Sequence, residues 1–341
     1  MMRMTKSIVN DLIKSKAYPE PTKNVEMLQT HISYIFITDD YVYKVKKPVN
    51  FGFLDFSTLD KRLFYCQKEI ELNKRLSPDV YLDVVPITDE GKELAFSGKG
   101  EVVDYAVKMR KIPMNKLMVN LLEEGKLTTD MIEKVSKKIA DFHEQAATSP
   151  EIEKFGTITV IKTNTDENFE QTKNYIGKAI TKTQFESIKN YTSEFYKRKK
   201  QVIKNRIDEH KIKDCHGDLH MQHVCLTEPI IIFDCIEFND RFRYSDTAAD
   251  IAFLAMDLDF HGRADLSKVL MDFYSKYSND IHIHDMLNFY KIYRAYVRGK
   301  VTSFQLDDPN ILKDEKEKAL DTAKRYFALA FDYVKEEKAN E

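Results

Sequence analysis

The sequence predicts an α+β protein with two lobes. Residues 1–110 are expected to form an antiparallel sheet that carries one helix, and residues 111–341 a mainly helical lobe. In the first part, short runs rich in β-branched and aromatic residues alternate with turn residues. In the second, apolar residues recur at helical spacing. A chain of 341 residues is long enough for two such lobes, each with ample core.

The first lobe begins with a polar helix over residues 6–16, followed by a hairpin. The strands of this hairpin are expected at 31–38 and 41–47, because only two aspartates separate these β-rich runs. Side chains alternate along a strand, so Lys44 and Lys46 lie on one face of the second strand.

One helix and three further strands complete the first lobe. The helix is predicted to begin at Ser57 or Thr58 and to end near Leu76, with Glu69 beside its apolar stripe. The remaining strands are expected at residues 81–87, 93–96 and 101–109.

Helices account for almost all of the second lobe. One is predicted near Asp130, where Asp130 and Glu133 have the spacing of a helix N-terminus, and a longer one from Thr183, where Thr183 and Glu186 have the spacing of a capping box. Residues 150–165 are expected to be irregular or extended. The stretch from Ser245 to about Phe260 is apolar nearly all round, which predicts a buried helix.

Composition argues against several classes of partner. The net charge is −2, from 53 basic and 55 acidic residues, so no global charge favours nucleic acid or a membrane surface. No run reaches the roughly 20 apolar residues of a membrane span, and the N-terminus lacks a signal-like apolar segment. The four cysteines form no CxxC pair and are expected to be buried hydrophobic residues. We therefore expect a cytoplasmic protein without a nucleic-acid or membrane partner.

The candidate chemistry lies in a polar stretch between short apolar runs. His216-Gly-Asp218 comes first, His223 lies five positions after Asp218, and Asp234 follows a buried run at 230–233. An unpaired carboxylate among apolar neighbours is costly, so Asp234 is expected to bind a metal ion or another cation.

These residues, with Lys44 and Glu69, match the groups that phosphoryl transfer from ATP requires. A lysine held by a helix carboxylate steadies the phosphates. One aspartate receives the proton of the attacking hydroxyl, and another binds Mg²⁺. This chemistry depends mostly on positioning and charge neutralisation, so few residue types are needed but their placement is strict.

The stretch from His216 to His223, with Ile232-Phe-Asp234, resembles the catalytic and metal-binding loops of the aminoglycoside phosphotransferase and choline kinase family. These are small-molecule kinases with a protein-kinase-like fold. Four segments resemble a bacterial branch in which this domain is often fused to a C-terminal P-loop ATP-binding domain: residues 42–48, 51–57, 69–73 and 233–239. The resemblance covers roughly residues 25–305, and only the kinase-like part is expected in this chain.

The resemblance implies a role for each matching residue. Asp218 would be the catalytic base and Asp234 a metal ligand, while Lys44 would contact the phosphates and Glu69 would hold it. Residues 110–113 would be the hinge that packs the adenine. The implied activity is ATP-dependent phosphoryl transfer to a hydroxyl of a small molecule, with Mg²⁺.

His223 departs from the family pattern, which has asparagine at this position. Histidine suits metals that are softer than Mg²⁺. Three outcomes stay open: Mg²⁺ held by Asp234 and water, Mn²⁺ in its place, or a weakened metal site. The expected hairpin also lacks the glycines of a phosphate-binding loop.

Several assignments have alternatives. Lys44 and Lys46 share one face of the strand, so one of them could simply reach solvent, and Lys44 is favoured as the phosphate lysine on its alignment with the strand. Asp246 and Asp250 lie one turn apart on the buried helix, so one of them is expected to anchor the catalytic loop. Candidate contacts to the acceptor are Glu237, Asn239, Arg241 and Arg298. Tyr290, Arg294 and Arg298 share one helical face, which either lines an anionic acceptor pocket or is solvated.

Two other functions compete with the kinase interpretation. The cluster of His216, Asp218, His220 and His223 has the composition of a metal-dependent hydrolase site. A catalytically impaired pseudokinase that binds nucleotide is the other alternative, prompted by His223. Neither the acceptor nor the oligomeric state follows from the sequence, and no acidic loop suited to polycationic antibiotics is evident.

Overall fold

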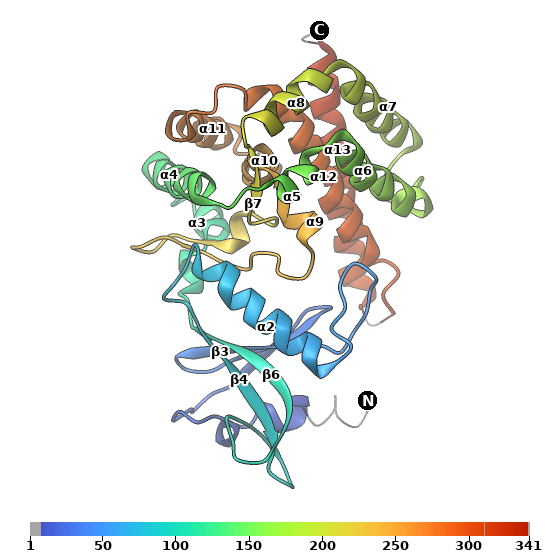
Figure 1. Cartoon of the computed structure of the whole chain (residues 1–341). Coiled ribbons are helices and arrows are strands. Elements are labelled where there is room, and N and C mark those ends of the chain that lie inside the picture. The colour runs from blue at the N-terminus through green and yellow to red at the C-terminus, as the bar shows by residue number, and fades with distance from the viewer. Residues whose placement is uncertain (1–7, 310, 340–341) are drawn as a thin grey trace. The chain divides into compact units, whose positions relative to one another are not determined.

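Residues 8–309 and 311–339 are described by the computed structural model of the chain (Figure 1). The chain divides into two compact units. Unit 1 comprises Met1–Glu124 and Gln222–Asp240, and unit 2 comprises Gly125–Met221 and Arg241–Glu341. The segment that carries Asp234 therefore packs within unit 1, whereas the division expected from the sequence placed it with the helical lobe.

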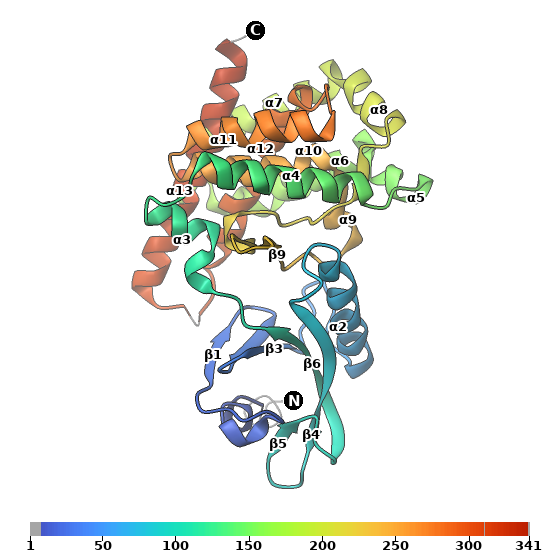
Figure 2. The same cartoon turned by 90° about the vertical axis from the view of Figure 1, so that its left-hand side faces the viewer.

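A six-stranded antiparallel sheet forms the centre of unit 1 (Figure 2). Its order is β1 (Glu26–Gln29), β2 (Ser33–Ile37), β3 (Tyr41–Lys46), β6 (Glu101–Arg110), β4 (Tyr81–Asp89) and β5 (Leu94–Phe96). Helix α2 (Leu59–Lys74) packs against β6 and β4 (Figure 1). The Thr58 side chain accepts a hydrogen bond from the Lys61 backbone N–H and caps α2, as predicted. The α+β class is confirmed.

The sheet separates an apolar face from a charged one. On β3, Tyr43 and Val45 lie in an apolar core with Phe36 and Phe96. Lys44 and Lys46 alternate with them, and both reach Glu69 on α2. The period of two along the strand, which the sequence predicts, thus directs both lysines towards the helix.

Strand β1 was not predicted. It pairs with β2 at the edge of the sheet, with Met27 opposite Phe36. Most of its side chains are exposed, so the run Glu26–Gln29 lacks the apolar alternation by which a strand is recognised.

The remaining short elements of unit 1 include the hairpin that precedes the candidate metal loop. Helix α3 (Met118–Glu123) follows β6, and the hairpin of β8 (Val224–Cys225) and β9 (Ile231–Ile232) precedes Asp234. An isolated bridge from Leu117 to Cys225 joins the two parts of the chain that make up this unit.

Unit 2 is built from helices, with one short strand pair, β7 (Ile212–Asp214) and β10 (Tyr244–Asp246). The long helices are α4 (Thr129–Gln145), α6 (Ile158–Thr172), α7 (Lys182–Arg198), α10 (Thr247–Phe260), α11 (Ala264–Ser278), α12 (His284–Phe304) and α13 (Lys313–Ala339). The shorter ones are α5 (Pro150–Glu153), α8 (Lys200–Asp208) and α9 (Asp240–Arg243). Helix α10 is buried along nearly its whole length, as predicted, and packs against α11 and α12.

Three local predictions in unit 2 are wrong. Residues 150–165 are mostly helical, in α5, a 3₁₀ turn at Lys154–Gly156 and the first half of α6, because tertiary packing outweighs the weak helix propensity of their threonines and β-branched residues. The capping box of α7 is Thr181 with Gln184, two positions before the predicted pair of the same spacing. Helix α4 is capped by Thr128 rather than Asp130.

Two further predictions concern the burial of the cysteines and the absence of a membrane span. All four cysteines are buried. Within residues 8–309 and 311–339, no helix combines the length and apolar character needed to cross a membrane.

Candidate active site

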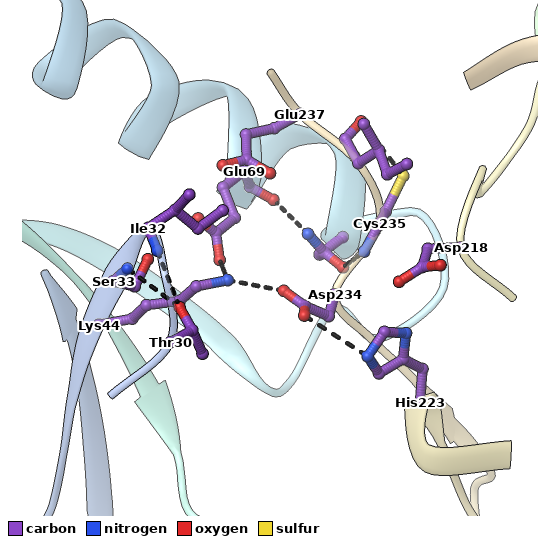
Figure 3. A network of polar contacts seen from close by, with 12 residues as sticks. Thr30, Ile32, Ser33, Lys44, Glu69, Asp218, His223, Asp234, Cys235 and Glu237 are labelled. Atoms are coloured by element: carbon purple, nitrogen blue, oxygen red, sulfur yellow. Dashed lines mark hydrogen bonds and ion pairs between the residues drawn. The ribbon is translucent and has the colours of Figure 1, made fainter. Parts of the chain in front are cut away.

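Lys44 bridges two carboxylates within unit 1. Its Nζ lies 2.9 Å from Glu69 Oε1 and 2.6 Å from Asp234 Oδ1 (Figure 3). The Glu69 side chain is fully buried and that of Lys44 is 12% exposed, whereas that of Asp234 is 41% exposed. The structure therefore forms the Lys44–Glu69 pair expected from the sequence, and the exposure to solvent is greatest at Asp234.

Lys46, the competing lysine, contacts the other oxygen of the same glutamate. Its Nζ lies 2.6 Å from Glu69 Oε2, is bonded to Glu237 Oε1, and stands 4.8 Å from the centre of the Phe56 ring. The side chain is fully buried. Lys44, and not Lys46, is thus the lysine with access to a ligand.

The charged groups around Glu69 shift one another's pKa values. Burial disfavours the ionised form of Glu69, but Lys44 and Lys46 outweigh it and lower the pKa of this carboxyl. Burial opposes the charge of Lys44, yet Asp234 and Glu69 raise its pKa well above the ordinary value. Burial raises the pKa of Glu237. Glu69 is therefore a carboxylate flanked by two ammonium groups.

The backbone of Asp234 adopts an uncommon conformation that several side chains stabilise. Its φ is +64°, in the left-handed region that residues other than glycine seldom enter. The Asp234 N–H donates to the Tyr81 hydroxyl at 3.0 Å, and the Cys235 N–H donates to Asn73 Oδ1 at 2.9 Å. Ser77 exchanges two hydrogen bonds with the backbone of Ile232. Sequence reasoning missed Asn73, Ser77 and Tyr81, which carry no motif of their own.

His223 supplies a second possible metal donor. The Phe233 N–H donates to the His223 carbonyl oxygen at 3.1 Å, which continues the β8–β9 hairpin. His223 Nε2 consequently lies 3.5 Å from Asp234 Oδ2 (Figure 3). Two donors at this separation fit one cation at bonding distances of about 2.0–2.3 Å. A nitrogen beside a carboxylate oxygen suits Mn²⁺ better than Mg²⁺, which prefers oxygen donors.

In unit 2, a buried carboxylate on α10 holds the loop that carries Asp218. Asp250 accepts hydrogen bonds from the backbone N–H groups of His216 and Gly217, at 2.9 and 2.8 Å. Its other neighbour is His143 Nε2, at 3.1 Å. Burial disfavours the charge of Asp250, but the hydrogen bond from His143 outweighs it and holds its pKa below the usual range. Asp250 is therefore the predicted anchor of the loop.

Asp246, the alternative anchor, has another role. It caps α10 by accepting from the Ala248 N–H at 2.9 Å, and it pairs with Arg206 at 2.6 Å.

Arg294 also holds this loop. Its Nη1 donates to the Gly217 carbonyl oxygen and its Nε to that of Ala249, each at 3.0 Å. Gly217 has a φ of +87°, which a residue with a side chain rarely adopts. The sequence suggested Arg294 for an acceptor pocket, but the structure shows it buried against the backbone.

Asp218 itself is partly exposed and has two histidines beside it. Its backbone N–H donates to His216 Nδ1 at 3.3 Å, and its Oδ2 lies 3.5 Å from His220 Nε2. Arg298 lies near enough for the Asp218 charge to act on it. Burial opposes the charge of Arg298, but Tyr326 and Asp218 raise its pKa.

The other predicted acceptor contacts are occupied by structural partners. Glu237 is buried against Lys46, which excludes it from an exposed acceptor pocket in this structure. Asn239 Nδ2 donates to the Phe53 carbonyl oxygen at 2.9 Å. Arg241 forms a two-pronged pair with Glu167, at 2.8 and 2.6 Å. Among these candidates, Arg298 has Asp218 among the charges that raise its pKa.

Two solved structures have a similar fold. A choline/ethanolamine kinase family protein from Mesorhizobium loti superposes with a TM-score of 0.53 at 14% identity, covering 98% of this chain and 99% of its own. A Ralstonia eutropha protein assigned as an aminoglycoside phosphotransferase gives a TM-score of 0.54 at 11% identity, covering 98% of each chain. The chain thus has the kinase-like fold of these proteins, as the resemblance predicted.

Sequence comparison leads to longer relatives. Uncharacterized proteins of Mycobacterium tuberculosis and Mycobacterium bovis are 31% identical over 279 residues, which is 81% of this chain and 54% of theirs. The chain therefore spans about half the length of these proteins. No protein-family profile matches it.

Proposed function

We propose that the protein is an ATP-dependent phosphotransferase that transfers the γ-phosphate to a hydroxyl group of a small molecule. The observation that carries the proposal is Lys44, held between the buried Glu69 and the more exposed Asp234. A lysine paired with a helix carboxylate, beside a metal-binding aspartate, is the arrangement that kinases use to hold ATP phosphates. The kinase-like fold supports the same conclusion.

Unit 1 supplies the groups for nucleotide and metal. Lys44 binds the phosphates and Glu69 holds its ammonium group. Asp234 and His223 would hold Mg²⁺ or Mn²⁺, which neutralises phosphate charge when bound. The segment at residues 110–113 is the proposed contact for the adenine.

Unit 2 supplies Asp218, the group that takes the proton. The hydroxyl oxygen of the small-molecule substrate bonds to the γ-phosphorus, the bond to the ADP oxygen breaks, and the hydroxyl proton passes to the Asp218 carboxylate. Asp250 and Arg294 position this residue by fixing the backbone before it. Arg298 is the proposed contact to the acceptor, because Asp218 is among the charges that act on it.

The hydrolase alternative has less support. His216 is fully buried and its Nδ1 accepts from the Asp218 backbone N–H, so this ring serves the loop. A hydrolase would also leave the Lys44–Glu69 pair without a role. Elemental analysis of the purified protein distinguishes the two, because a hydrolase of this composition would retain zinc.

A screen of ATP consumption tests the proposal. Sugars, amino alcohols and aminoglycosides are offered as acceptors, each with Mg²⁺ and with Mn²⁺. Asp218→Ala should lower turnover by about 100-fold or more, since a general base contributes that much, while nucleotide binding persists. Asp208→Ala, which removes an exposed acid paired with Lys204, is the control and should leave turnover unchanged.

Two results would contradict the proposal. Full activity in Asp218→Ala would remove its mechanism. A wild-type protein that binds ATP but turns over none with any acceptor or metal would instead be a pseudokinase.

A further inference from the structure

Five charged side chains of unit 1 form an unbroken row of alternating sign. The order is Asp234, Lys44, Glu69, Lys46 and Glu237. Each oxygen of Glu69 binds a different lysine. The two lysines lie two residues apart on β3, and the two ends of the row lie three residues apart on one loop. The loop is thus tied to β3 twice.

The two ties differ in their access to solvent. In the outer tie, the side chains of Lys44 and Asp234 are 12% and 41% exposed. In the inner tie, the Lys46 and Glu237 side chains are 0% and 4% exposed. The outer tie is therefore open to a ligand, and the inner tie is buried.

The outer tie must open when the proposed substrates bind. Lys44 is assigned to the phosphates and Asp234 to the metal ion, and both tasks compete with their contact to each other. Opening it would release the Asp234 end of the loop from β3. Lys46 and Glu237 have no such second task, so their contact persists.

We propose that Lys46 and Glu237 are positioning residues, which keep Glu69 and the Asp234 loop in place while the Lys44–Asp234 contact opens for nucleotide and metal. This inference rests on the proposed function and extends it. It replaces the expectation that Glu237 contacts the acceptor with a role in metal binding exerted through Asp234.

The test removes both inner charges together, because Lys46→Met alone would leave the buried Glu237 carboxylate without its cation. The variant is Lys46→Met combined with Glu237→Gln. The matched control is Lys47→Met, which removes the next lysine, whose Nζ donates to the Thr30 carbonyl oxygen at the surface. Mn²⁺ binding with an ATP analogue is followed by electron paramagnetic resonance, and kcat by ATP consumption.

The double variant should bind Mn²⁺ about 10- to 100-fold more weakly, the usual effect of losing groups that orient a metal ligand. Its kcat should fall while the KM for the acceptor stays unchanged, a split that general loss of structure would not give. A folded double variant with wild-type Mn²⁺ affinity and kcat would overturn the inference.

If the double variant does not fold, Glu237→Gln alone carries the test, since the amide retains a hydrogen-bond acceptor for Lys46. Weaker Mn²⁺ binding in this variant supports the inference, and unchanged binding overturns it. If the wild type shows neither Mn²⁺ binding nor ATP turnover, the proposed function fails as well. If the wild type binds Mn²⁺ and turns over ATP, and the variant does so equally well, only the positioning role is overturned.

Discussion

A buried carboxylate helps to hold each of the loops around Asp234 and Asp218, but the two carboxylates bind different kinds of partner. Glu69, in unit 1, binds two lysine ammonium groups. Asp250, in unit 2, accepts two backbone N–H groups, from His216 and Gly217. Side-chain charges can exchange partners when a ligand arrives, whereas backbone hydrogen bonds to a buried group have no substitute. Under the proposed function, the adjustable loop serves the nucleotide and metal, and the fixed loop carries Asp218, which takes the proton.

The largest effect on stability is expected from Asp250→Ala. It removes the acceptor of two buried N–H groups and the partner of His143. The free energy of unfolding should fall by about 3–5 kcal/mol, as measured by urea denaturation. The control is Asp265→Ala, an exposed acid paired with Arg263, which should change it by less than about 1 kcal/mol. A small effect of Asp250→Ala would show that the Asp218 loop is held by other contacts.

A smaller loss of stability, about 2 kcal/mol, is expected from Glu69→Gln, because the amide keeps the shape but loses the charge between Lys44 and Lys46. Turnover should fall together with ATP affinity, since Lys44 is no longer held. Glu71→Gln, which alters an exposed acid on the same helix, is the control. An unchanged ATP affinity in Glu69→Gln would show that the Lys44–Glu69 pair has no role in nucleotide binding.

The contribution of the Glu69 charge to the free energy of unfolding should depend on pH. The two lysines lower the pKa of Glu69 despite its burial. The stability that its charge contributes is therefore complete above the unfolded pKa of about 4.3. It is lost as the pH falls through the lower folded value. The difference in unfolding free energy between wild type and Glu69→Gln should thus narrow only below about pH 4.3. Narrowing near neutral pH would contradict the lowered pKa.

The sequence predicted the groups with local spacing better than those with distant partners. Lys44, Glu69 and Asp234 come together as expected because strand, helix and loop patterns each point one residue at the site. Arg294 and Glu237 were assigned to the acceptor, since nothing local reveals that their partners are the Gly217 carbonyl oxygen and Lys46, 77 and 191 positions away. Edge strand β1 and helix α6 were missed because pairing and packing outweigh their weak local patterns.

The central claim is that Asp218 and Asp234 serve one phosphoryl transfer in different ways. The most direct test compares Asp218→Asn with Asp234→Asn in two assays: Mn²⁺ binding with an ATP analogue, and transfer of labelled γ-phosphate to an acceptor found in the screen. Both variants should lose transfer by about 100-fold or more, while Asp234→Asn alone loses Mn²⁺ binding. Equal loss of Mn²⁺ binding in both variants, or undiminished transfer in either, would contradict the account.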